Sequence, residues 1–306
     1  MSKQRLKPNL LVVGVAKSGT SSLHQYLEQH PKIFMSPAKE PRFISSQVCD
    51  LPLGGPKDDK VEAWYIKNEE EYLNLFEGVS DEKVIGESSA DTFYFHQKTI
   101  PFIQQYFGDP KIIVVLRDPV KRAFSAYQHL RRDEREHLSF DKGLEKENDR
   151  INNNFELIYH YKAVGLYAKG LTAFLNSFSN VKVILTEELS KNTKEVLADL
   201  FDFLGVENDI SIDTSQKYNM SGIPRSKKIH QVLFEGSDSL RIVKPLVRRL
   251  LNKKQRDRLS RRIQQKNLKR LTIEPHTKEK LMDFYRSDIM DCEKILGRSL
   301  ELWKNS

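Results

Sequence analysis

The 306-residue chain has few of the residues that bind metals or cross-link secreted proteins. It contains two cysteines, Cys49 and Cys292, which lack the close spacing of a zinc site. Its eight histidines are scattered, and no two of them form an H-x-x-x-H pair. This composition excludes a framework of several disulfides, and it predicts free thiols in a reducing compartment and no metal site.

Long apolar runs and linkers are missing as well. Residues 1–9 carry charge and lead into a short apolar run at 10–13. A signal peptide needs an apolar core of about 7–15 residues, and a membrane span needs about 20. No Pro-, Gly- or Ser-rich stretch divides the chain. The sequence therefore predicts a cytoplasmic protein with a single domain over residues 1–306.

Short apolar segments typical of buried strands recur along the chain, separated by helical patterns. The predicted strands are 10–13, 84–86, 112–116 and 181–185. Helices are expected from about residue 23, over 120–132, between about 165 and 178, and over 188–204 and 277–296. This alternation predicts an α/β fold in three layers, with a mainly parallel central sheet flanked by helices.

A small-residue turn follows the first predicted strand. Residues 14–22 read Gly-Val-Ala-Lys-Ser-Gly-Thr-Ser-Ser and lead into a helix. Such a turn directs free backbone N–H groups and the positive end of the helix dipole toward an anion, and Lys17 adds a full charge. In the Walker motif of P-loop proteins, G-x-x-x-x-G-K-[ST], lysine directly follows the second glycine and precedes the hydroxyl residue that holds Mg²⁺. Here Lys17 precedes the second glycine, Gly19, so lysine and hydroxyl lie in a different register. The turn is therefore P-loop-like, and a plain strand-to-helix connection is the alternative.

A second candidate anion site follows the predicted strand 112–116. Arg117 comes directly after that strand, and Ser125 lies in the following helix, for which Asp118 is the expected N-cap and Pro119 the first residue. Ligands of open parallel sheets bind at the carboxyl ends of the strands. An NTPase prefers an acidic, metal-binding residue at such an end. Arginine favours a second anionic group instead, so the two sites together indicate a nucleotide with phosphates at both ends.

These blocks resemble the sulfotransferases that use 3′-phosphoadenosine 5′-phosphosulfate (PAPS), a family that includes bacterial and heparan-sulfate-type enzymes. The likeness lies in residues 13–21, in residues 116–127 and in Lys39-Glu40-Pro41-Arg42-Phe43-Ile44. It implies PAPS as the sulfuryl donor, 3′-phosphoadenosine 5′-phosphate (PAP) as the product, and no metal requirement. Arg117 and Ser125 match the residues that bind the 3′-phosphate, and Arg225, in a loop resembling the one that closes over the nucleotide, is a further candidate. The residues assigned to the 5′-phosphosulfate group are Lys17, Ser18, Gly19, Thr20, Ser21 and Ser22.

The resemblance also assigns catalytic roles. Lys17 and the turn N–H groups are expected to stabilise the leaving phosphate, and Glu40 to remove the acceptor proton. The ordinary pKa of a glutamate, about 4.3, is low for a base at neutral pH unless burial raises it. Without the resemblance, Glu40 before Pro41 is typical of a solvated loop residue.

The acceptor is less defined. The heparan-sulfate branch carries a second lysine where this chain has Ser88, so Lys39 or Arg42 is expected to compensate, unless the acceptor chemistry differs. Arg42 also replaces that branch's histidine, which points away from heparan sulfate, and pairing of Arg42 with an acid is the alternative role. Lys39, Arg42 and Ser88 are thus the candidate acceptor-binding residues. The family favours a carbohydrate or lipid-linked hydroxyl over an amine, as part of a glycan, a glycolipid or a small molecule.

Positive charge is concentrated in residues 241–270, which hold thirteen Lys and Arg residues and one acid, Asp257. With the leucines of the same segment, this pattern predicts basic amphipathic helices that attract the acceptor or an anionic membrane surface. A solvated helical face is the alternative. Nucleic acid is not expected, because no nucleic-acid-binding motif is present. The competing functions are a P-loop-type kinase or NTPase and a non-catalytic nucleotide-binding protein.

Overall fold

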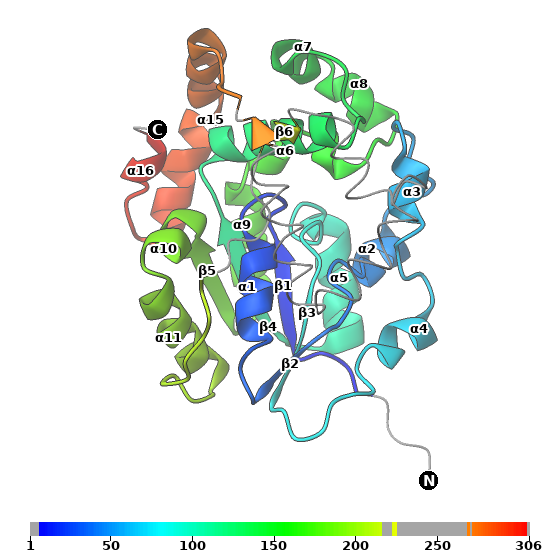
Figure 1. Ribbon diagram of the computed structural model, residues 1–306, viewed down its shortest axis with the longest axis vertical. Coiled ribbons are helices and arrows are strands. Elements are labelled where there is room, and N and C mark those ends of the chain that lie inside the picture. The colour runs from blue at the N-terminus through cyan, green and yellow to red at the C-terminus, as the bar shows by residue number, and fades with distance from the viewer. Residues whose placement is uncertain (1–5, 216–221, 225–267, 270, 305–306) are drawn as a thin grey trace, which may run out of the picture.

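The computed structural model describes residues 6–215, 222–224, 268–269 and 271–304. Its centre is a five-stranded, all-parallel sheet in the order β2-β3-β1-β4-β5 (Figure 1). The strands are β1 (Leu10–Gly14), β2 (Ile33–Met35), β3 (Val84–Ser88), β4 (Lys111–Leu116) and β5 (Val181–Leu185). A separate antiparallel pair joins β6 (Ile223–Pro224) to β7 (Leu268–Lys269). The predicted α/β fold with a mainly parallel sheet is confirmed.

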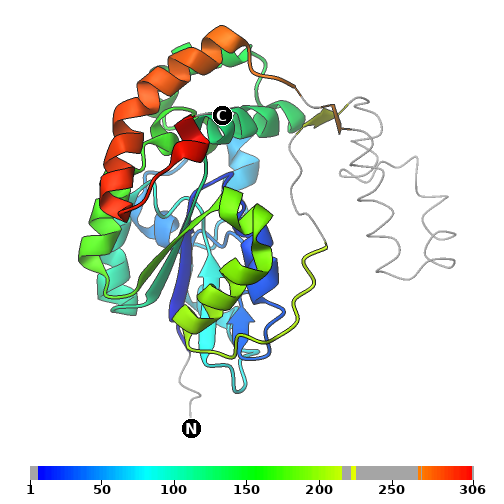
Figure 2. The same ribbon diagram turned by 90° about the vertical axis from the view of Figure 1, so that its left-hand side faces the viewer.

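Helices cover both faces of the sheet. Leu10 and Val12 face one layer and Leu11 and Val13 the other, because side chains alternate along a strand. The first layer contains α1 (Thr20–Leu27), α10 (Thr186–Lys191) and α11 (Thr193–Leu204). The second contains α5 (His96–Phe107), α6 (Pro119–Arg132), α9 (Ala168–Ser177) and α15 (Pro275–Leu296). Figure 2 shows the sheet between these layers.

Shorter elements surround one end of the sheet and its edge. α2 (Phe43–Val48) and α4 (Glu69–Asn74) pack beside β3 in a small aromatic cluster that includes the stacked rings of Phe43 and Tyr72. The remaining helices are α3 (Asp58–Glu62), α7 (Phe140–Glu145), α8 (Glu147–Asn152) and α16 (Glu301–Lys304). Two 3₁₀ turns, η1 (Leu157–Tyr159) and η2 (Ala163–Gly165), precede α9.

The order in which strands are added to the sheet changes between β1 and β4: β3 and β2 lie on one side of β1, and β4 and β5 lie on the other. The connection after β1 enters α1 on one face, and the connection after β4 enters α6 on the other. Such a switch point opens a crevice at the carboxyl ends of the two strands. The predicted cap of α6 is confirmed, since the buried Asp118 side chain accepts hydrogen bonds from Val120 N and Lys121 N and Pro119 is the first helical residue.

Two predicted features differ from the structure. The expected continuous helix over 188–204 is wrong: α10 and α11 are separate helices, broken at Asn192, whose φ of −125° and ψ of 51° lie outside the helical region. Asparagine favours such breaks because its side chain competes with the helix for backbone hydrogen bonds. The sequence pattern also missed β2, which at three residues is too short to show a period.

Among the described helices, none is both long and apolar enough to cross a membrane. Apart from residues 268–269, the basic segment 241–270 lies outside the described residues, and so does Arg225. The assignment of residues 1–306 to one domain stays a prediction.

Candidate active site

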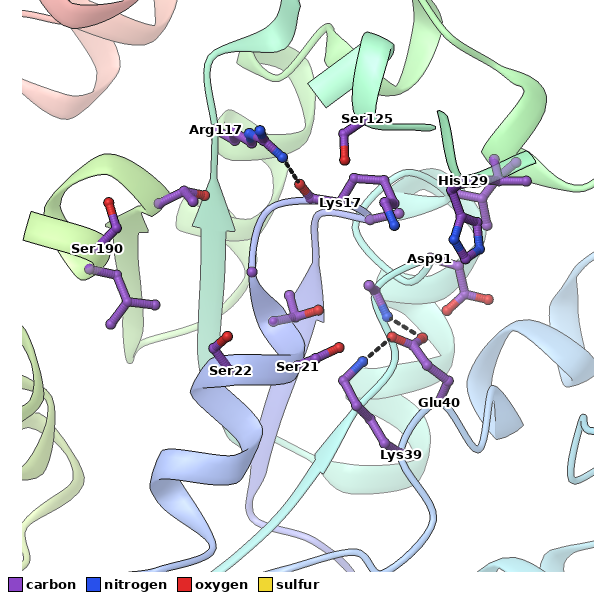
Figure 3. Close-up of a pocket in the computed structure, with 18 of the residues that line it drawn as sticks. Lys17, Ser21, Ser22, Lys39, Glu40, Asp91, Arg117, Ser125, His129 and Ser190 are labelled. Carbon is purple, nitrogen blue, oxygen red and sulfur yellow. Dashed lines mark hydrogen bonds and ion pairs between the residues drawn. The ribbon is translucent and has the colours of Figure 1, made fainter. Parts of the chain in front are cut away.

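A cavity of about 470 Å³ opens at the switch point between β1 and β4. Figure 3 shows Arg117 and Ser190 toward one end, Glu40, Asp91 and His129 toward the other, and Lys17 between the two groups. Most of the predicted site residues line it: Lys17, Gly19, Thr20, Ser21, Ser22, Lys39, Glu40, Arg42, Arg117 and Ser125. The fold thus brings together three segments that are far apart in the sequence.

The turn after β1 forms the floor of the cavity. Gly14 allows the strand to approach Phe93 closely, since a Cβ on Gly14 would lie 2.7 Å from the Cβ of Phe93. Gly19, with a φ of +92°, caps α1 in a left-handed conformation that favours glycine. The backbone N–H groups of Gly19, Thr20 and Ser21 have no acceptor within the described part of the chain. They provide the donor set that an anion requires at a helix N-terminus.

Lys17 and Arg117 carry the positive charge of this end. Neither side chain forms an ion pair with any described residue. Burial lowers the pKa of Lys17 to about 7, and the nearby charges of Arg132 and Arg117 contribute to that shift. Burial likewise lowers the pKa of Arg117, although arginine remains charged at neutral pH. More distant acids, Glu187 and Asp118 for Arg117 and Asp133 for Lys17, offset these shifts in part. Two cations without a direct ion-pair partner among the described residues are therefore available to an anionic ligand.

Hydrogen bonds hold the two loops together. The Arg117 guanidinium donates to the carbonyl oxygen of Lys17 at 2.9 Å (Figure 3). The Thr186 hydroxyl lies 2.5 Å from the Ser18 carbonyl oxygen and 2.8 Å from that of Leu116. The hydroxyl of Tyr167 donates to the Arg117 carbonyl oxygen at 2.9 Å. These contacts fix the spacing of the two cations before any ligand binds.

Glu40 is held in the cavity by several donors. Its backbone has a φ of +61°, and its carboxylate lies 2.5 Å from Lys39 Nζ and accepts a 2.9 Å hydrogen bond from Ala90 N. Burial acts to raise the pKa of Glu40, but the charges of Lys39 and Arg42 outweigh it and bring the pKa below its ordinary value. Glu40 is therefore ionised at neutral pH, and burial does not make it a stronger base.

Arg42 belongs to a buried network of charges. Its guanidinium donates to the Tyr65 hydroxyl at 2.7 Å and to Glu156 at 2.9 Å. Arg135 pairs with Glu156 at 2.6 Å and also with Asp58. Burial acts to raise the pKa of Glu156, and the two arginines bring it below its ordinary value. The alternative role for Arg42, pairing with an acid, is the one that the geometry supports.

Two predicted side chains do not reach the cavity. Ser18 is fully buried and does not line the cavity; it follows Lys17, whose φ is +74°. Ser88 is also fully buried, and its hydroxyl lies 2.9 Å from His24 Nδ1. These positions correct the expectation that both hydroxyls face a ligand. The roles of the remaining candidates stay predictions, as does the absence of a metal requirement.

Sequence reasoning missed several residues that line the cavity, among them Asp91 and His129. His129 lies four residues after Ser125 on α6, so the two side chains share one face of the helix and both line the cavity. This spacing is the signal in the sequence that could have identified His129 as a neighbour of Ser125. The Nδ1 atom of His129 lies 2.5 Å from the Arg132 guanidinium, which can only donate, and burial holds the pKa of His129 well below its usual range. Other missed lining residues are Glu156, Thr186 and Ser190.

Comparisons with known proteins identify the family to which the chain is related. The sequence profile of the sulfotransferase family matches residues 8–209. The crystal structure of a sulfotransferase from Alicyclobacillus acidocaldarius is similar over 98% of this chain and 99% of that one, with a TM-score of 0.77 and 34% identity.

Curated relatives are similar over shorter regions. Membrane-associated sulfotransferase kil1 of Dictyostelium discoideum is 34% identical over 151 residues, which cover 47% of this chain and 29% of that protein. Human heparan sulfate glucosamine 3-O-sulfotransferase 3B1 is 27% identical over 224 residues, covering 72% of this chain and 52% of the relative. The chain thus spans about half or less of the length of these relatives. Together with the fold, the family match shows that the chain belongs to the sulfotransferase family.

Proposed function

We propose that the protein transfers a sulfuryl group from PAPS to a hydroxyl group of an acceptor, with a carbohydrate or lipid-linked hydroxyl preferred over an amine. The observation that carries this proposal is one cavity that holds two unpaired cations at one end and an ionised carboxylate, Glu40, at the other. The first end suits a nucleotide with separate phosphate groups, and the second suits a hydroxyl that must lose a proton.

The donor end fits PAPS. Lys17 and the free N–H groups at the start of α1 would bind the 5′-phosphosulfate, as anions bind at helix N-termini. Arg117, with Ser125 beside it, would bind the 3′-phosphate through the planar geometry that lysine cannot copy. Thr186 and Ser190 line the remaining part of this end and are available to the nucleoside.

The reaction can be written with the residues present. The acceptor oxygen forms a bond to sulfur while the bond between sulfur and the 5′-phosphate oxygen breaks, and PAP leaves with the added negative charge. Lys17 stabilises that charge. The acceptor proton passes to Glu40. Since a hydroxyl becomes more acidic as its oxygen bonds to sulfur, a carboxylate with a low pKa can accept the proton in the transition state.

The names of the relatives support a carbohydrate acceptor. Heparan sulfate glucosamine and carbohydrate appear in the names of relatives that this chain matches over 72% and 66% of its length. A basic membrane- or glycan-binding role for residues 241–270 stays a prediction, as does the cytoplasmic location.

Donor binding is tested by titration calorimetry with PAP, without added metal, beside ADP and AMP. We expect PAP to bind more tightly than either, and Arg117→Ala to weaken PAP at least tenfold through loss of charged hydrogen bonds. Arg298→Ala is the matched control, because Arg298 pairs with Glu188 and does not line the cavity. Preference for Mg·ATP, or equal binding by Arg117→Ala and the wild type, would contradict the proposal.

The pKa of Lys17 predicts a pH effect. Lys17 is charged below about pH 7 in the free protein and loses its charge above it. We expect kcat/KM for PAPS to fall as the pH rises through about 7, whereas Lys17→Arg should remove this decline because arginine stays charged. The measurement is a pH–rate profile of both proteins. A decline of the same size in Lys17→Arg would show that another group is responsible.

Glu40→Gln tests the proton acceptor while preserving shape and an oxygen for Ala90 N. Loss of a positioned base is expected to reduce kcat by about 10²- to 10⁴-fold, with PAP affinity changed little. Single-turnover transfer from labelled PAPS measures the effect. Retention of the wild-type rate would remove Glu40 from the mechanism.

A further inference from the structure

The Asp91 side chain is an unsatisfied carboxyl group in the wall of the cavity. It is 2% exposed, and its Oδ2 accepts a hydrogen bond from the Ser45 hydroxyl. Its Oδ1 is buried and has no hydrogen-bond partner within the described part of the chain. Buried polar atoms in folded proteins are nearly always satisfied, and leaving one unpaired is costly. Because Asp91 lines the cavity, a ligand group that packs against it there is the candidate partner for this oxygen, which water does not reach in the free protein.

Asp91 lies at the end of the cavity where the acceptor must react. It follows the carboxyl end of β3, and it lines the cavity with Glu40 and His129, away from Arg117 (Figure 3). Burial is the main cause that raises the pKa of Asp91 above its ordinary value; the charge of Arg42 acts to lower this pKa, and the charge of Glu40 acts to raise it. A ligand that presents a hydroxyl to Glu40 therefore brings its neighbouring groups to Asp91.

The cations of this end are already neutralised. Lys39 pairs with Glu40 at 2.5 Å, and Arg42 pairs with Glu156 at 2.9 Å. By contrast, Lys17 and Arg117 have no ion-pair partner among the described residues. The described wall thus has two cations without an ion-pair partner where the donor binds, and one carboxyl oxygen without a hydrogen-bond partner where the acceptor binds. An anionic acceptor group beside Asp91 would meet repulsion without a free cation.

We propose that Asp91 Oδ1 accepts a hydrogen bond from a second hydroxyl of the acceptor, adjacent to the hydroxyl that receives the sulfuryl group. The acceptor is accordingly an uncharged polyol, such as a neutral sugar, and its reacting region carries no anionic group. This inference rests on the proposed sulfotransferase function and narrows its substrate class.

The test uses labelled PAPS with two kinds of probe. The first is a panel of neutral methyl glycosides of glucose, galactose, mannose and N-acetylglucosamine, and the second is a polyanionic heparosan hexasaccharide. We expect transfer to at least one neutral glycoside to exceed transfer to heparosan. Higher transfer to heparosan, or no transfer to any glycoside by a protein that binds PAP, would overturn the inference. Failure to bind PAP would instead remove the proposed function on which it rests.

The role of Asp91 is then measured with the preferred glycoside. Asp91→Asn keeps one side-chain oxygen, which stays with the Ser45 hydroxyl, and places an amide nitrogen, which can only donate, at the Oδ1 position. This variant should raise the acceptor KM about ten- to a hundredfold, the effect of losing a charged hydrogen bond, without changing PAP affinity. One monodeoxy analogue of that glycoside should have the same KM with the variant and with the wild type. An analogue that lacks the hydroxyl bound by Asp91 cannot form this hydrogen bond with either protein. If the variant does not fold, the hydrogen bond is measured instead in the wild type, as the increase in acceptor KM that this deoxy substitution causes.

Glu87→Gln is the matched control. Glu87 is another buried carboxyl group on β3, it accepts a hydrogen bond from the Ser89 hydroxyl, and it does not line the cavity. Burial raises the pKa of Glu87 to about 8, so an uncharged amide resembles its protonated form. We expect the acceptor KM of this variant to match the wild type. An equal increase in KM for Glu87→Gln and Asp91→Asn would show a general effect of the buried network and contradict a contact with the acceptor.

Discussion

The confinement of two unpaired cations at one edge of a parallel sheet is the constraint on which this site depends. Burying Lys17 and Arg117 without a direct ion-pair partner is unfavourable for the free protein, as the lowered pKa of each shows, and an anionic ligand relieves that cost. The surrounding structure holds them in place. Gly14 allows the turn after β1 to approach Phe93, Arg117 bonds to the carbonyl oxygen of Lys17, and Thr186 lies against both loops. Preorganised positive charge of this kind both binds an anionic donor and stabilises the charge that develops when it leaves.

The two ends of the cavity differ in how their cations are paired, and the proposed roles of the two ends follow from that difference. At the Glu40 end, Lys39 and Arg42 are paired with carboxylates, so they tune and position acids instead of binding free anions. Their proximity also keeps the pKa of Glu40 low. In the proposed reaction, such a carboxylate would be too weak a base for a resting hydroxyl but sufficient for a hydroxyl that is already bonding to sulfur, so proton removal would be coupled to sulfuryl transfer.

Local patterns predicted the parts of the site that follow single strands. Lys17 and Arg117 could be found because each directly follows a buried apolar run, and parallel strands bring such ends together. Asp91, His129 and Glu156 escaped notice because only tertiary packing turns them into one cavity. The burial of Ser18 outside the cavity could not be predicted for a related reason: the residue before it, Lys17, has a left-handed backbone, and a lysine in the sequence gives little sign of that conformation. The break at Asn192 and the short strand β2 are likewise decided by contacts beyond the local pattern.

The structure of the protein with PAP bound tests the central claim most directly. The account predicts the 5′-phosphate at Lys17 and the free N–H groups of the turn, the 3′-phosphate at Arg117 and Ser125, and open space between the 5′-phosphate and Glu40 for the sulfuryl group and the acceptor. Phosphate groups bound outside the Lys17–Arg117 edge, or a nucleotide that occupies the space beside Glu40 and Asp91, would contradict it.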